Sequence, residues 1–186
     1  GMNTVKNNGY GNLTLRGGKF INYTQTVIMN SGSVKIENGS FELIEKIEGS
    51  FSVEGADGFN PSEAVIYATK DSVANKASNT AVTGGTFEGG IVLGDNLSSA
   101  PESEDIQFSG GTFSEPVPAE YLAEGFTLAA DGDGFSVLTE ETVADYMAYI
   151  TGEDGTAIYY ETLQEAVEAA VAGGTIVLVK DIEATG

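Results

Sequence analysis

The sequence predicts an all-β solenoid, a parallel β-helix that carries a small C-terminal α/β appendage of hairpins and one amphipathic helix. Two observations predict this class. An eight-residue unit recurs through the first two thirds of the chain, at intervals in the twenties of residues or near twice that value. After residue 116 the unit no longer recurs, and near residue 162 the spacing of apolar residues changes from a strand period to a helix period.

The recurring unit reads apolar-x-apolar-x-(Gly/Asn)-Gly-x-Phe and occupies residues 13–20, 34–41, 80–87 and 106–113. Alternating apolar residues describe a short strand with one buried face. The glycine that follows can turn the chain sharply, because it lacks a Cβ and tolerates positive φ. The phenylalanine then returns to the interior at a fixed offset. The glycine and phenylalanine positions are Gly18, Phe20, Gly39, Phe41, Gly85, Phe87, Gly111 and Phe113.

The intervals between successive phenylalanines are 21, 46 and 26 residues, so the middle interval predicts two coils. Coils of this length cannot bury their apolar faces alone and are expected to stack, with like positions about 4.8 Å apart. The third and eighth positions would then form apolar ladders inside the stack. A leucine-rich repeat has a similar period but different consensus columns. A β-sandwich is the other alternative, and it would leave the recurring columns unexplained.

Residues 1–116 are predicted to form the coils, and local patterns add further elements to them. Residues 3–12 are polar and rich in Gly and Asn, so we expect a poorly anchored lead-in. Apolar runs predict strands at 26–29, 64–69 and 91–93, the second of them in the additional coil of the middle interval. Polar stretches predict exposed loops at 54–60, 70–79 and 95–105.

Residues 117–186 are predicted to form the appendage. Pro118 suits the first turn of a short helix that ends at Gly125. Glycine-rich turns at 131–134 and 152–155, each flanked by apolar strands, predict two hairpins.

The last part of the chain has a helical pattern. From Thr162 to Val171 the apolar residues follow one helical stripe, and Thr162 and Glu165 have the spacing of a capping box. Residues 175–179 are apolar on both faces and predict a buried strand.

The composition excludes several kinds of catalytic site. The chain contains no cysteine, so neither a disulfide framework nor a thiolate metal site is available. It also contains no histidine, which removes Ser-His-Asp and Cys-His catalysis as well as imidazole metal ligands.

The charge is strongly negative and unevenly distributed. Twenty-eight acidic residues against eight basic ones give a formal charge of −20. No acidic residue precedes Glu37, whereas Lys6, Arg16, Lys19 and Lys35 all lie before it. Such a charge repels nucleic acid and anionic lipid, and no apolar run approaches the roughly 20 residues that span a bilayer. The sequence therefore predicts no nucleic-acid partner, no membrane insertion and a solubilising acidic exterior, with a cation-binding surface as the alternative.

The Gly-Gly-Thr-Phe copies at 84–87 and 110–113 resemble right-handed parallel β-helix repeats in large surface proteins of anaerobic gut bacteria, which have a pectin-lyase-like architecture. The resemblance covers about residues 13–116. It implies a right-handed coil, an extracellular or cell-surface location, and a polysaccharide or a host or cell-surface protein as partner.

A second resemblance concerns residues 159–182, which look like the helix-plus-strand unit that commonly opens a β-helix in such proteins. Because the unit comes last here, the resemblance implies a piece of a longer tandem protein. The ends of such a solenoid also allow end-to-end self-association.

Polysaccharide lyases of this architecture gather carboxylates for Ca²⁺ on one strand face, beside a Lys or Arg base. The outward positions beside the predicted ladders hold Arg16, Lys35 and Glu37, with Arg16 and Glu37 as stacked neighbours. These three residues are the candidate ligand surface, and Lys19 is a further candidate base. Glu42 and Glu88 share one column, but the predicted coil count places them two coils apart as solvated surface. No carboxylate column forms, so the sequence assigns no catalytic residue, cofactor site or metal ligand.

Two other motifs have simpler interpretations. Residues 131–134 begin like the calcium-binding loop of an EF-hand. Such a loop needs an oxygen ligand at its fifth position and a glutamate at its twelfth, where this chain has Phe135 and Thr142. We therefore interpret the segment as a hairpin turn. Ca²⁺ is therefore a candidate cofactor without a supporting motif. Four tyrosines could stack on sugar rings, although strand alternation predicts that half of them pack against the helix: Tyr146, Tyr149, Tyr159 and Tyr160.

These observations favour a non-catalytic structural or adhesin-like module of a bacterial surface protein, in which a stacked core holds exposed loops apart. Carbohydrate binding along the flank of the solenoid is the alternative from another class. A polysaccharide lyase or hydrolase is the third. An exposed row of aromatic rings would favour carbohydrate binding, and a carboxylate cluster beside Arg16 or Lys35 would favour an enzyme.

Overall fold

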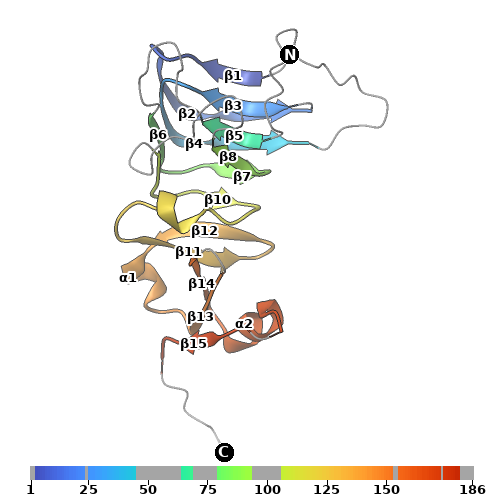
Figure 1. Ribbon diagram of the computed structural model, residues 1–186, viewed down its shortest axis with the longest axis vertical. Coiled ribbons are helices and arrows are strands. Elements are labelled where there is room, and N and C mark those ends of the chain that lie inside the picture. Colours follow the sequence, from blue (N-terminus) through green and yellow to red (C-terminus); the bar gives the residue numbers. More distant parts are fainter. Residues whose placement is uncertain are drawn as a thin grey trace, which may run out of the picture.

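The computed structural model describes residues 3–23, 25–44, 64–68, 79–93, 106–152, 155–172 and 174–180. These residues form mostly β-strands with a few short helices, so the predicted all-β class is confirmed. The strands lie across the long axis of the molecule and follow one another along it from the N-terminal to the C-terminal end (Figure 1). The predicted loops 54–60 and 95–105, and nearly all of 70–79, lie outside the described residues.

Two sheets of parallel strands make up the N-terminal part. The first sheet contains, in spatial order, β1 (Asn3–Asn7), β3 (Thr26–Asn30), β5 (Ala64–Ala68) and β8 (Ile91–Leu93). The second contains β2 (Asn12–Asn22), β4 (Ser33–Leu43), β6 (Asn79–Val82), β7 (Thr86–Glu88), β9 (Ile106–Phe108) and β10 (Thr112–Phe113). One apolar cluster contains buried side chains of both sheets, such as Ile28 and Ile66 from the first and Ile36 and Phe87 from the second. The main core therefore lies between the two sheets.

The register of the second sheet corrects the predicted number of coils. Val34 on β4 is the direct partner of Thr80 on β6, so the second and third copies of the repeat are neighbours. Strand β5 lies between β3 and β8 and belongs to the same turn of the chain as β6, rather than to an additional coil. The interval of 46 residues therefore holds one coil with a long insertion, which the spacing alone could not distinguish from two short coils.

The phenylalanine of every repeat stacks on that of the next. The rings of Phe20, Phe41, Phe87 and Phe113 lie nearly parallel, with successive centroids 5.0, 4.9 and 4.8 Å apart. Their Cα atoms are direct register partners from strand to strand. Because parallel strands are also about 4.8 Å apart, the ring stack and the backbone ladder share one repeat distance. The eighth position of the repeat thus forms the ladder that the sequence predicts.

Two adjacent glycines allow this stacking, each for a different reason. The glycine at the sixth position has positive φ in every copy, from 107° at Gly111 to 138° at Gly39. The glycine at the fifth position faces the backbone of the preceding coil: a Cβ on Gly84 would lie 2.5 Å from the carbonyl oxygen of Glu37, and one on Gly110 would lie 2.4 Å from that of Thr83. The sixth position requires a left-handed backbone, and Gly84 and Gly110 at the fifth position require the absence of a side chain.

The N-terminal segment is not the weakly anchored lead-in that its composition predicts. Residues Asn3–Asn7 form strand β1, which pairs in parallel with β3. Asn7 is buried, and its side-chain amide donates to Oδ1 of Asn30 at 2.9 Å and to the carbonyl oxygen of Ser33 at 2.9 Å. Asn30 in turn donates to the hydroxyl oxygen of Thr80 at 2.9 Å. Buried asparagines thus connect successive coils, so polar composition here marks a hydrogen-bonded corner.

The C-terminal part continues the second sheet with mostly antiparallel strands. Strand β12 pairs with β10, so one sheet extends across the predicted boundary at residues 116 and 117. Both predicted hairpins are present, as β11–β12 and β13–β14. The elements are η2 (Ala119–Tyr121), β11 (Phe126–Asp131), β12 (Gly134–Thr139), α1 (Glu140–Val143), β13 (Ala148–Thr151), β14 (Ala157–Tyr160), α2 (Leu163–Ala169) and β15 (Ile176–Leu178).

Three predictions for this part need correction. The helix after Pro118 is a single 3-10 turn, η2, rather than a helix that reaches Gly125. Helix α2 has the predicted capping box at Thr162 but ends at Ala169, and Val171 beyond it is 78% exposed. Strand β15 pairs only with β13 among the described strands and is partly exposed, not buried. The apolar patterns near the C-terminal end thus predict helix α2 and strand β15. The burial of these elements depends on neighbouring segments that the patterns do not contain.

We predict that Phe87→Ala lowers the free energy of unfolding by about 3–5 kcal/mol, because it removes a fully buried ring that stacks on both sides. Phe20→Ala, at the end of the stack, should have a smaller effect, and Tyr10→Ala, 86% exposed, a change within about 0.5 kcal/mol. Chemical denaturation followed by circular dichroism measures all three. Equal losses for Phe87→Ala and Tyr10→Ala would contradict the ring stack.

Gly110→Ala and Gly17→Ala form a matched pair, since both glycines occupy the fifth position of the repeat. Gly17 lies on the edge strand β2, where an added Cβ has nothing within 4 Å. We predict that Gly110→Ala destabilises the fold by about 1–3 kcal/mol through its clash with the Thr83 carbonyl, and that Gly17→Ala changes stability by less than about 0.5 kcal/mol. Thermal unfolding of the two variants provides the comparison, and a Gly17→Ala loss as large as that of Gly110→Ala would refute this account.

Candidate functional site

The candidate ligand surface, Arg16, Lys35 and Glu37, is brought together on strands β2 and β4. Nε of Arg16 lies 3.0 Å from Oε2 of Glu37, and Nζ of Lys35 lies 2.9 Å from Oε1 of the same carboxylate. Both oxygens of Glu37 are thus engaged, and the side chain of Arg16 remains 78% exposed. The sequence predicts Arg16 and Glu37 as stacked neighbours, and their side chains do meet, but a register shift makes Asn38 the Cα partner of Arg16. The cluster is a surface network of two cations on one carboxylate.

A second charged group lies on the same strands, just beyond the phenylalanine column. Glu42 and Glu88 are direct register partners on β4 and β7, so the prediction that they lie two coils apart is wrong for the same reason as the coil count. Nζ of Lys19 lies 2.7 Å from Oε1 of Glu42. The hydroxyl of Ser40 also donates to that oxygen at 3.2 Å. Lys19, the further candidate base, is therefore held by a carboxylate.

The pKa shifts follow from these contacts. Lys35 first, and then Arg16, lower the pKa of Glu37 below its ordinary value by stabilising the carboxylate. Lys19 does the same for the pKa of Glu42, and the contact with Glu42 raises the pKa of Lys19. A lysine whose pKa is raised stays protonated near neutral pH, which makes Lys19 unsuited to act as a general base there.

The calcium-like segment forms a tight hairpin turn. Asp131 and Gly134 are register partners at the ends of β11 and β12, with Gly132 at φ 60° between them. Oδ2 of Asp131 accepts a hydrogen bond of 2.6 Å from the hydroxyl of Ser136, so the carboxylate is turned toward its own hairpin. Within the described ranges, no group of three acidic residues is placed to hold a metal ion.

The four tyrosines divide between two environments. Tyr149 and Tyr159 are cross-strand partners on β13 and β14, with ring centroids 5.2 Å apart, and both are half-buried. Tyr160 is only 8% exposed and packs in a small apolar cluster with Ala148 and with Ala166 of helix α2. The apolar cluster thus contains one of the four tyrosines beside the helix, whereas strand alternation predicts that half of them pack there.

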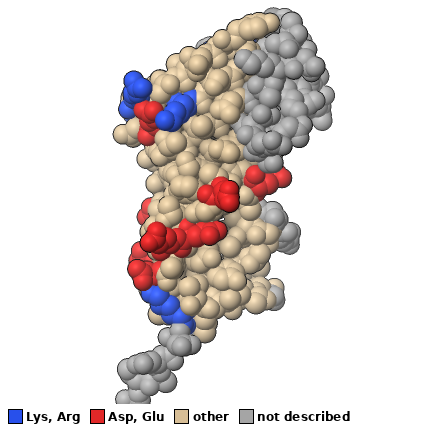
Figure 2. Space-filling view, turned by 90° about the vertical axis from the view of Figure 1, so that its left-hand side faces the viewer, with Lys and Arg blue, Asp and Glu red and all other residues tan. Residues whose placement is uncertain are grey.

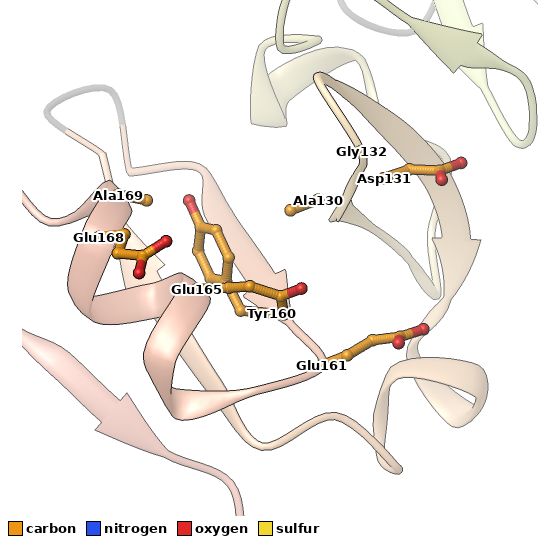
Figure 3. A pocket seen from close by; sticks show the side chains of 8 residues that line it. All are labelled: Ala130, Asp131, Gly132, Tyr160, Glu161, Glu165, Glu168 and Ala169. Carbon is orange, nitrogen blue, oxygen red and sulfur yellow. The ribbon is translucent and has the colours of Figure 1, made fainter.

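A cavity of about 400 Å³ opens between helix α2 and the β11–β12 hairpin. Figure 3 shows Tyr160 rising from β14 into this space, with its hydroxyl directed between the helix and the hairpin. The sequence does not predict this cavity, because its walls come from segments about thirty residues apart in the chain. The lining residues are Ala130, Asp131, Gly132, Tyr160, Glu161, Glu165, Glu168 and Ala169.

Part of the cavity did have a signal in the sequence. Glu165 and Glu168 are spaced i, i+3, which places two carboxylates on one side of helix α2, and Glu161 precedes the N-cap residue Thr162. The spacing predicts an acidic helix face but not the hairpin that stands opposite it.

Figure 2 shows how the charges are distributed on one side of the molecule. Basic side chains gather near one end beside a few acidic ones, and a band of acidic side chains covers the part nearer the C-terminal end. Lys180 is the only basic residue of the sequence after Lys76, and its Nζ lies 3.1 Å from Oδ1 of Asp145. The C-terminal part therefore carries a large excess of negative charge.

Comparisons with protein-family models, with curated proteins and with solved structures gave no match. The helices among the described residues are all too short or too polar to cross a membrane. The function of the chain is therefore inferred from its own geometry.

We predict that Lys35→Gln raises the pKa of Glu37 and that Arg16→Gln raises it by a smaller amount, in line with the order of their effects on the carboxylate. Carboxyl titration by NMR measures both. Because the pKa values of Glu37 and Glu42 are lower in the folded than in the unfolded chain, these ion pairs stabilise the fold at neutral pH. Their contribution is lost as the pH falls through the folded-state carboxyl pKa values. An unchanged Glu37 titration in Lys35→Gln would show that the two groups do not interact.

Proposed function

We propose that this chain is a non-catalytic, extracellular structural or adhesin-like module built as a right-handed parallel β-helix. The observation that carries the proposal is the in-register stack of Phe20, Phe41, Phe87 and Phe113. A ladder of identical rings fixes each coil on the next and makes a stiff rod, which is the requirement for a spacer or a display scaffold.

The arrangement of the parallel strands supports the β-helix architecture. Strands of the two sheets alternate along the chain from β1 to β5, and each pairs in parallel with a later strand of its own sheet. The shared core and the resemblance of the Gly-Gly-Thr-Phe copies to repeats of surface proteins point to the same architecture. The loops expected at 70–79 and 95–105, which a display scaffold would present, lie almost wholly outside the described residues.

The charged residues of the flank support a non-catalytic role. Arg16, Lys19 and Lys35 each form an ion pair with Glu37 or Glu42, and the second carboxylate of the column, Glu88, adds to the field on Lys19. A polysaccharide lyase needs a base that can lose its proton, whereas the contact with Glu42 raises the pKa of Lys19 and keeps it protonated. An enzymatic function is therefore the least supported of the three candidate functions.

Carbohydrate binding is the second candidate function, and the Tyr149–Tyr159 pair favours it. Two half-buried rings on adjacent strands offer a small aromatic surface of the kind on which sugar rings stack. The surface would bind a glycan without turning it over.

A glycan array screened with calcium and again with a chelator separates these candidates. The scaffold proposal predicts no reproducible binding in either condition. Binding to one glycan class that is lost in Tyr149→Ala, but kept in Tyr10→Ala, would replace the scaffold by the carbohydrate-binding function. Depolymerisation of a bound polysaccharide would overturn both and establish an enzyme.

A further inference from the structure

The cavity between helix α2 and the β11–β12 hairpin has an excess of negative charge that nothing in its lining neutralises. Four of its eight lining residues are acidic and none is basic. Glu161, Asp131 and Glu165 also act on one neighbouring group: after burial, which is the largest cause, these carboxylates raise the pKa of Tyr146. The fields of these three carboxylates therefore overlap at Tyr146. A site with this potential attracts cations and excludes anions.

Tyr160 provides a second, independent indication of a ligand. The residue is 8% exposed, and its hydroxyl enters the cavity (Figure 3). In the part of the chain that the structure describes, this hydroxyl has no hydrogen-bond partner. Burial alone raises the pKa of Tyr160, so the phenol stays neutral and can both accept and donate a hydrogen bond. The ring of Tyr160 is buried while its hydroxyl faces the cavity, so a group bound in the cavity can pair with that hydroxyl.

The geometry distinguishes an organic cation from a metal ion. No three acidic residues of the described segments converge as metal ligands. Three of the carboxylates are also engaged within the chain. Asp131 accepts from the hydroxyl of Ser136 at 2.6 Å, Glu165 accepts from the backbone N–H of Thr162 at 3.0 Å, and Glu168 accepts from Nε2 of Gln164 at 2.6 Å. A cavity of about 400 Å³ far exceeds the size of a bare ion, and the methyl groups of Ala130 and Ala169 contribute apolar lining.

We propose that this cavity binds a primary ammonium group carried on an organic body. The ammonium donates to the hydroxyl oxygen of Tyr160 and to the carboxylate of Glu168, and the attached carbon atoms lie against Ala130 and Ala169. A lysine side chain of a protein and an amino sugar both present this chemistry. The inference does not depend on the role of the stacked coils, because every residue of the site belongs to the C-terminal elements.

The test titrates the whole chain with four probes at low ionic strength, followed by two-dimensional amide NMR. The charged probes are Nα-acetyl-lysine methylamide and glucosamine, and their neutral counterparts are Nα-acetyl-norleucine methylamide and N-acetylglucosamine. We expect saturable shifts of the Ala130 and Ala169 amides with one or both charged probes and none with the neutral ones. The probe that binds more tightly identifies the source of the ammonium group. Raising the salt concentration to 1 M should abolish the shifts, since exposed charges are screened.

Two variants locate the binding groups, each with a matched control. Tyr160→Phe keeps the ring and removes the hydroxyl, and it should weaken binding by about tenfold, whereas Tyr10→Phe, the same change at a tyrosine outside the cavity, should leave it unchanged. Glu168→Gln should weaken binding roughly two- to fivefold, whereas Glu141→Gln, the same change on helix α1, should not. Glu168 is exposed, so this variant keeps the test valid if Tyr160→Phe destabilises the fold.

Three results would overturn the proposal. These are the absence of shifts at Ala130 and Ala169 with both amines, equal shifts with the neutral probes, and equal weakening in Glu168→Gln and Glu141→Gln. The last result would mean that the amines respond only to the overall charge of −20. A failed amine titration leaves the scaffold proposal as it stands, because the glycan array tests that proposal separately and does not depend on amine binding in the cavity.

Discussion

The stacking of one phenylalanine ring on the next is the contact on which the rest of the N-terminal structure depends. Successive centroids are 4.8 to 5.0 Å apart, which is also the spacing of hydrogen-bonded strands. The rings and the backbone therefore reinforce one register, and a slip of one residue would turn every apolar side chain outward. The sixth position of the repeat is a glycine with positive φ in every copy, and Gly84 and Gly110 at the fifth position each face a carbonyl oxygen of the neighbouring strand's copy.

A polar ladder accompanies the aromatic one. The buried amides of Asn7 and Asn30 bind each other, the adjacent backbone and the hydroxyl of Thr80, at the corner where the chain passes from one sheet to the other. Strands bend away at such a corner, so their backbone groups need other partners, and asparagine can both donate and accept. The core of this fold is thus apolar between the sheets and hydrogen-bonded at an edge.

Charge divides the molecule into two parts with different chemistry. On the flank of the stack the basic residues are held in ion pairs with Glu37 and Glu42, so little potential remains to attract a ligand. In the C-terminal part the carboxylates outnumber any available cation, and Lys180 is held by Asp145. Helix α2 has only seven residues and is too short to be stable alone, so its packing on Tyr160 keeps the acidic cavity in place. The proposed binding site and the proposed scaffold thus lie in different parts of the chain.

The sequence by itself determined the repeat, the inward columns, the two hairpins and the capping box at Thr162, because each depends on residues that are close in the chain or recur at a fixed offset. It also placed Arg16 beside Glu37, since stacked coils bring equivalent positions together. It could not determine the number of coils, because an insertion and an extra coil have the same length. Nor could it determine the burial of Val171 and β15, the strand at 3–7, or the cavity around Tyr160. Those features depend on which distant segments face each other, and only tertiary contacts decide that.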